Sequence, residues 1–142
     1  MKADRNPYLR PCLSALGITA LVGIFSAVYE HFGHGVYSNY MVFAFFFPLL
    51  LLALPRFALL LLEDRRRGRE RPLEEGGAVW TLWNAGAATL TLGSLFRGIL
   101  EIYGTQSPLE KPYFLLGALL LVLGALLFMG GKGRRPAALE EG

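Results

Sequence analysis

The chain has 142 residues, of which 54% are apolar and 18% are charged, and its formal net charge is +3. The charged residues fall in blocks between long apolar runs, which is the pattern of a multi-spanning membrane protein. This composition leaves no room for a separate soluble domain, and the sequence carries no nucleic-acid-binding module and no soluble-enzyme motif.

Four apolar runs are long enough to cross a bilayer, because about 20 helical residues at 1.5 Å each cover the hydrocarbon core. They cover residues 13–35, 39–62, 78–104 and 112–131. We therefore expect an all-α membrane protein in which residues 1–142 form a single domain of four transmembrane helices. The charged stretch 63–77 predicts a solvated loop, and residues 132–142 predict a polar tail.

The first segment carries small residues at alternating spacings of three and four, which are Ala20, Gly23 and Ala27, and the same stripe continues to Glu30 and His34. The third segment has a comparable stripe, made of Asn84, Ala87, Thr91, Ser94, Gly98 and Glu101. Small residues let membrane helices approach closely. The simplest packing therefore places the first and third helices together at the centre, with the Leu-rich and Phe-rich second and fourth helices facing lipid.

The second segment contains Pro48 and Pro55, and a proline inside a membrane helix frees backbone carbonyls that can bend the helix or receive a ligand. Arg56 in this segment is predicted to snorkel toward the membrane surface, at about the depth of Asn84 in the third segment. If this level and the opposite end of the bundle are both hydrated, Asn84, Thr91 and Ser94 would join them as a polar path.

The basic residues predict the topology. Eleven of them lie at the N-terminus, in the middle loop and in the tail, whereas the two other loops contain one, Lys111. By the positive-inside rule, both termini and the middle loop are cytoplasmic, and the protein is expected in the plasma membrane. The positive-inside topology already explains the charge of the basic loop, with contact to anionic lipid in addition, so we expect the lipid bilayer and no nucleic acid as a partner.

The two halves of the sequence resemble each other. Phe25 to Gly33 matches Phe96 to Gly104 at an offset of 71 residues, half the chain, and the match aligns Glu30 with Glu101. The pattern is consistent with two duplicated helical hairpins. Since both halves have the same orientation, they would be related by a pseudo-twofold axis along the membrane normal.

A cluster of ionisable residues is predicted at the outer ends of the first and third helices. It comprises Glu30, His31, His34, Arg97 and Glu101, and carboxylates in membrane segments tend to be functional. Two pairs, Glu30 with His34 and Arg97 with Glu101, have the spacing of four that allows contact on one helix face. Such a cluster could bind a cation, hold an anionic group at Arg97 or relay protons.

A metal ion is one candidate ligand, held by His31, His34, Glu30 and Glu101. Haem is disfavoured within a monomer, because two imidazoles from one helical turn cannot ligate it from opposite sides, although a homodimer escapes this objection. Two structural interpretations stay open beside the functional one. The polar side chains could reach the aqueous interface, or Arg97 could form a structural ion pair with Glu30 or Glu101.

Three functions follow from these alternatives. The first is a transporter or channel for a proton, a small cation or a small polar solute, because two close carboxylates in a partly dry site cannot both ionise easily. The second is a metal-binding or redox membrane protein. The third is a non-catalytic membrane subunit or assembly factor. Catalytic residues are not identified, and a homodimer is one way to enclose a pathway.

Overall fold

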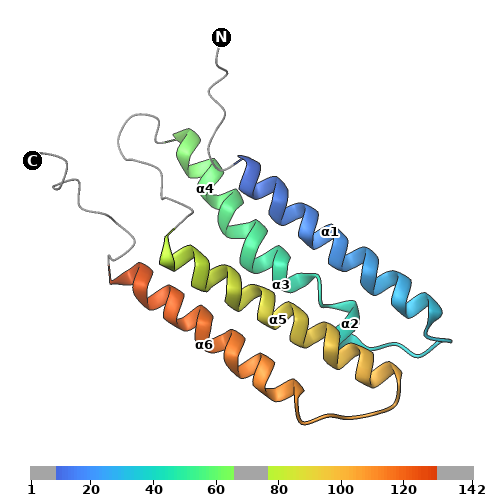
Figure 1. The fold of residues 1–142 in the computed structure, drawn as a ribbon. Helices are drawn as coiled ribbons and strands as arrows, with labels where there is room; N and C mark the ends of the chain where they lie inside the picture. Colours follow the sequence, from blue (N-terminus) through green and yellow to red (C-terminus); the bar gives the residue numbers. More distant parts are fainter. Residues whose placement is uncertain (1–8, 66–76, 131–142) are drawn as a thin grey trace, which may run out of the picture.

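The computed structural model describes residues 9–65 and 77–130, and in these ranges the chain forms helices joined by short connections. The helices in Figure 1 are α1 (Leu9–Phe32), α2 (Asn39–Val42), α3 (Phe46–Pro48), the π-helical turn η1 (Leu49–Ala53), α4 (Leu54–Arg65), α5 (Ala78–Ile102) and α6 (Glu110–Met129). The predicted tail and most of the predicted 63–77 loop lie outside the described residues.

Three stretches of helix are long and apolar enough to cross a membrane, namely Leu9–Phe32, Asn39–Leu62 and Glu110–Met129. Most of their side chains are not covered by the rest of the chain, as expected for helices that face lipid. The protein is therefore an all-helical membrane protein. Within the described residues α5 does not reach the apolar character of the other three, because its sequence alternates apolar with small and polar residues.

The helices lie side by side in the order α1, the 39–65 segment, α5 and α6 (Figure 1). The predicted central pairing of the first and third helices is wrong, because α1 packs against the 39–65 segment, which lies between it and α5. The second helical segment thus lies between α1 and α5, although most of its side chains are left uncovered by the chain. The small residues of α5 pack against its two neighbours, α2 and α6. The small residues of α1 therefore do not pack against α5.

Glycines set the close contact between α5 and α6. A Cβ added to Gly93 would lie 2.8 Å from the Cβ of Tyr113, and one added to Gly117 would lie 2.7 Å from Leu90 Cγ and 3.1 Å from the Leu90 backbone nitrogen. Side chains at these positions would push the helices apart, so the glycines allow the backbones to approach. On its other side α5 meets α2, where a Cβ added to Gly98 would lie 2.8 Å from the Cβ of Met41.

The 39–65 segment is interrupted where its prolines remove hydrogen-bond donors. Pro55 has no N–H for the Leu51 carbonyl, which lies four residues earlier, and the Trp83 indole Nε1 of α5 donates to that carbonyl at 2.7 Å instead. The adjacent Leu52 carbonyl accepts a hydrogen bond from Arg56 Nη1 at 3.1 Å. The Leu51 and Leu52 carbonyls both accept hydrogen bonds from side chains, one of them from the neighbouring helix.

Candidate functional site

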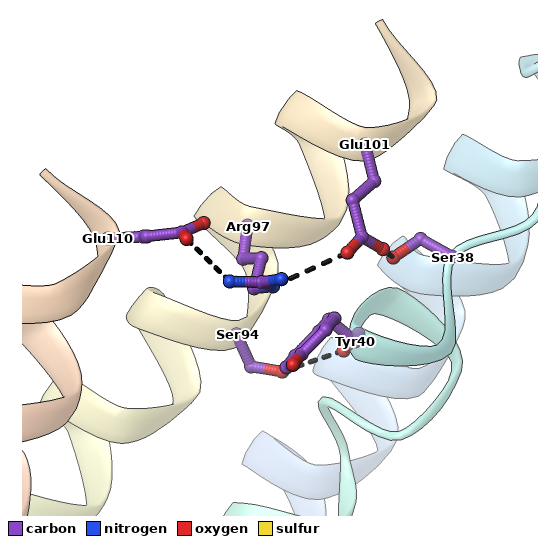
Figure 2. Close-up of polar contacts among 6 residues, drawn as sticks. All are labelled: Ser38, Tyr40, Ser94, Arg97, Glu101 and Glu110. Atoms are coloured by element: carbon purple, nitrogen blue, oxygen red, sulfur yellow. Dashed lines mark hydrogen bonds and ion pairs between the residues drawn. The ribbon is translucent and has the colours of Figure 1, made fainter. Parts of the chain in front are cut away.

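The Arg97 guanidinium is the centre of a polar cluster at one end of the bundle (Figure 2). Its Nη1 donates to Glu110 Oε1, at the start of α6, at 2.5 Å. Its Nε lies 3.3 Å from Glu101 Oε1, four residues along α5, as an ion pair without hydrogen-bond alignment. The guanidinium carbon stands 4.2 Å from the centre of the Tyr40 ring, a cation–π contact. Arg97 thus ties α5 to α6 and to α2.

The two predicted carboxylates meet at a residue that the sequence analysis did not single out, Ser38. The Ser38 hydroxyl donates to Glu101 Oε2 at 2.5 Å, and the Ser38 backbone N–H donates to Glu30 Oε1 at 3.4 Å. Ser38 is 1% exposed, so both contacts are made at a buried residue. Glu30 of α1 and Glu101 of α5 therefore converge on one point, although their helices are not packed together.

A short turn after α1 places Ser38 there. The helix ends at Phe32, and the Gly33 N–H closes a tight turn onto the Glu30 carbonyl at 3.0 Å. His34 and Gly35 follow with φ angles of 53° and 85°, which reverse the chain. Ser38 then stands at the N-cap of α2, and its carbonyl accepts hydrogen bonds from the N–H groups of Met41 and Val42.

This turn corrects the predicted pairing of Glu30 with His34. Their spacing of four requires a continuous helix, but α1 stops before His34, whose backbone is in the left-handed region and whose side chain is exposed. His31 is also exposed, and its ring contacts the neighbouring Phe32. Among the described residues, no group of three or more His, Cys, Asp or Glu could hold a metal ion. The predicted metal set of His31, His34, Glu30 and Glu101 is therefore not assembled there.

The three residues of the predicted polar path are engaged within the protein. The hydroxyl of Ser94, which is 1% exposed, donates to the Tyr40 carbonyl at 2.7 Å (Figure 2), and the buried Thr91 hydroxyl donates to the Ala87 carbonyl of its own helix at 2.8 Å. Asn84 Oδ1 accepts a hydrogen bond from Arg56 Nη2 at 3.0 Å. Asn84 and Ser94 therefore join α5 to the 39–65 segment, whereas Thr91 is engaged within α5.

Arg56 forms a second polar level. The depth predicted for Arg56 and Asn84 is matched by their direct hydrogen bond, but the predicted snorkelling is wrong, since Arg56 is 7% exposed. Its guanidinium also lies 5.2 Å from the centre of the Trp80 ring. The Leu52 carbonyl and these α5 side chains together solvate the cation inside the bundle, so it does not need to reach the surface.

Besides Ser38, the sequence analysis missed Tyr40 and Glu110. Both follow connections between helices; the position of Tyr40 fits an interfacial aromatic belt as well as a site, and the positive-inside rule does not count acidic residues such as Glu110. A signal was present, since Glu110 begins an apolar helix, where a carboxylate is favoured by the helix dipole. A carboxylate there can pair with an arginine near the end of the preceding helix, α5.

The charges of the cluster do not balance. Arg97 is shared by Glu101 and Glu110, whereas Glu30 has no ion pair among residues 9–62 and 77–130; its carboxylate accepts the single long hydrogen bond from Ser38. Three carboxylates thus stand against one guanidinium in a partly buried region.

Comparison of the chain with protein-family models, with curated proteins and with solved structures finds no match, so the interpretation of this cluster depends on its own geometry.

Proposed function

We propose that this chain is a four-span membrane protein that takes up a proton or a small cation between Glu30 and Glu101 and couples this uptake to the movement of an ion or a small polar solute. The observation that carries the proposal is the convergence of both carboxylates on Ser38, one on its N–H and one on its hydroxyl. The two carboxylates accept from different donors of one residue, so a cation that neutralises either carboxylate changes how Ser38 is held.

Such a change has a mechanical consequence. Ser38 belongs to the turn between α1 and α2, and Glu101 stands one residue before the end of α5. When the hydroxyl releases Glu101, the turn loses its side-chain hydrogen bond to α5 while the rest of the bundle keeps its glycine-mediated packing. Motion of this turn is the step that we assign to the exchange of cation or solute.

The proposed topology takes α5 as the fourth span, since it lies between two stretches that are apolar enough to cross the membrane. Both termini are then cytoplasmic, the membrane is the plasma membrane, and the Arg97 cluster lies at the outer side. Duplication of a helical hairpin would account for the positions of Glu30 and Glu101 in the last turns of α1 and α5. Two copies of the chain would enclose the pathway between them.

Flux in proteoliposomes tests the proposal. Glu30→Gln and Glu101→Gln keep the shape of the side chain and remove its charge, so each variant and the double variant should lose proton-coupled or cation-coupled flux while remaining folded. His34→Asn is the matched control, because His34 is exposed and asparagine tolerates the left-handed backbone there. Equal flux from the wild type and the double variant would refute the proposal.

A second candidate, a non-catalytic subunit whose polar residues fix helix packing, is favoured by one observation. Each residue of the proposed polar path is engaged by protein groups. This candidate predicts that the double variant loses thermal stability in detergent. The two measurements therefore separate the candidates, since transport requires a loss of flux in a variant that stays folded.

A further inference from the structure

An open groove of about 500 Å³ runs along α1 beside α2 and the start of α3. Most of its lining is apolar and includes Ala20, Gly23, Ala27 and Phe45, and Glu30 stands at one end. The groove is lined by the small-residue face of α1. In the observed helix order, this face does not pack against α5. Its volume falls in the range of roughly 300–1,000 Å³ typical of small-molecule sites.

A buried hydroxyl in the lining indicates that the groove accommodates a ligand. Ser26 is 3% exposed, and its Oγ has no hydrogen-bond partner among the described residues. Buried hydroxyls are almost always hydrogen-bonded, and the exceptions call for an explanation. A residue that lines a groove and lacks a partner is explained by a ligand that brings one, either directly or through water.

Glu30 determines the charge of the ligand. It lies four residues after Ser26 on the same face of α1, and its carboxylate has the long Ser38 hydrogen bond and no ion pair among residues 9–62 and 77–130. From Thr19 to Glu30 the groove extends about 16 Å along the helix, at 1.5 Å per residue. An apolar groove that ends at a carboxylate near the end of a membrane helix is complementary to a ligand with an apolar tail and a cationic head.

We infer that this groove binds an amphiphilic organic cation, with its apolar tail along Ala20 and Gly23 and its ammonium group between the Ser26 hydroxyl and the Glu30 carboxylate. The inference rests on the proposed function in one respect, the use of Glu30 as a cation-binding carboxylate, and it names the class of solute. The ammonium head supplies the counter-charge that Glu30 lacks. The tail covers a face of α1 that the chain leaves open.

Octylammonium, with octanol and octanoate as matched probes of neutral and negative charge, tests the inference on the full chain in nanodiscs of zwitterionic lipid. Binding is followed by shifts of the backbone amide resonances of Gly23, Ser26 and Ala27. Octylammonium should give saturable shifts with an affinity roughly tenfold or more above that of octanol, since interactions with a charged partner contribute about 1.5–3 kcal/mol. Octanoate should give none.

Two variants locate the site. Glu30→Gln should reduce octylammonium to the affinity of octanol, and Gly23→Leu should abolish its binding by filling the groove. Gly17→Leu is the matched control on the same helix, because a Cβ at Gly17 meets nothing within 4 Å and Gly17 does not line the groove; this variant should bind normally. If Gly23→Leu fails to fold, Gly23→Ala serves, since its added Cβ would make an ordinary 3.8 Å contact with Phe45 and should weaken binding.

Three results would overturn the inference. Octanol that binds as tightly as octylammonium would show a groove for neutral chains such as lipid tails. Octylammonium binding that survives Glu30→Gln would show that the carboxylate does not bind the ammonium group. If the same variant lost flux, the proposed ion site at Glu30 would still be supported without the groove site. Pairing of two copies through Gly23 and Ala27 that excludes octylammonium would make the groove a dimer contact. If binding depends on Glu30 but flux does not, the proposed function fails and the groove site stands.

Discussion

Replacing Ser38 with alanine removes the hydroxyl that reaches Glu101 and keeps the N–H that reaches Glu30. Hydrogen bonds between membrane helices contribute about 0.6 kcal/mol on average and at most about 1.7 kcal/mol. The acceptor here is a carboxylate, the donor–acceptor distance is 2.5 Å, and Ser38 is 1% exposed, so we expect a loss near the upper end, about 1.5 kcal/mol. The assay is the free energy of unfolding in bicelles, measured by steric trapping.

A double-mutant cycle makes this prediction specific. Ser38→Ala and Glu101→Gln should couple by about 1 kcal/mol, because both remove the same charged hydrogen bond. Ser38→Ala and Glu30→Gln should be additive within about 0.3 kcal/mol, because Glu30 contacts the backbone of Ser38 and not its hydroxyl. Equal coupling to both carboxylates, or none to Glu101, would refute the geometry described above.

Further variants test the packing around the cluster. Gly98→Ala places a Cβ 2.8 Å from the Cβ of Met41 and should destabilise the protein by about 1–3 kcal/mol in the same unfolding assay, whereas Gly17→Ala should be neutral or stabilising. A Gly98→Ala variant with an unchanged free energy of unfolding would contradict the close approach of α2 and α5. Trp83→Phe leaves the Leu51 carbonyl without its indole donor and should cost about 1–2 kcal/mol. An unchanged free energy would mean that the carbonyl has another partner.

Local spacing was the most informative part of the sequence. The interval of four between Arg97 and Glu101 predicted a shared helix face, and the two side chains form an ion pair. Comparable depth placed Arg56 beside Asn84, and the two are hydrogen-bonded. Both inferences needed only a helix and a membrane boundary, which hydropathy supplies.

The arrangement of the helices could not be read in the same way. Small residues occur on both α1 and α5, and the pattern does not state which helix each stripe will meet; on α5 they meet α6 and α2. A turn at Gly33 to Gly35 ends α1. Glu30 and His34 therefore do not share a continuous helix, and their spacing of four does not bring them together. Helical periodicity has no means of placing Ser38, because it lies in that connection.

The most direct test of the central claim observes Ser38 itself. In nanodiscs, the Ser38 amide resonance should move when the wild-type protein is titrated with protons or Na⁺, and this movement should be lost in both Glu30→Gln and Glu101→Gln. A Ser38 resonance that responds equally in the wild type and the double variant, or in neither, would contradict the proposal that the two carboxylates take up a cation at this residue.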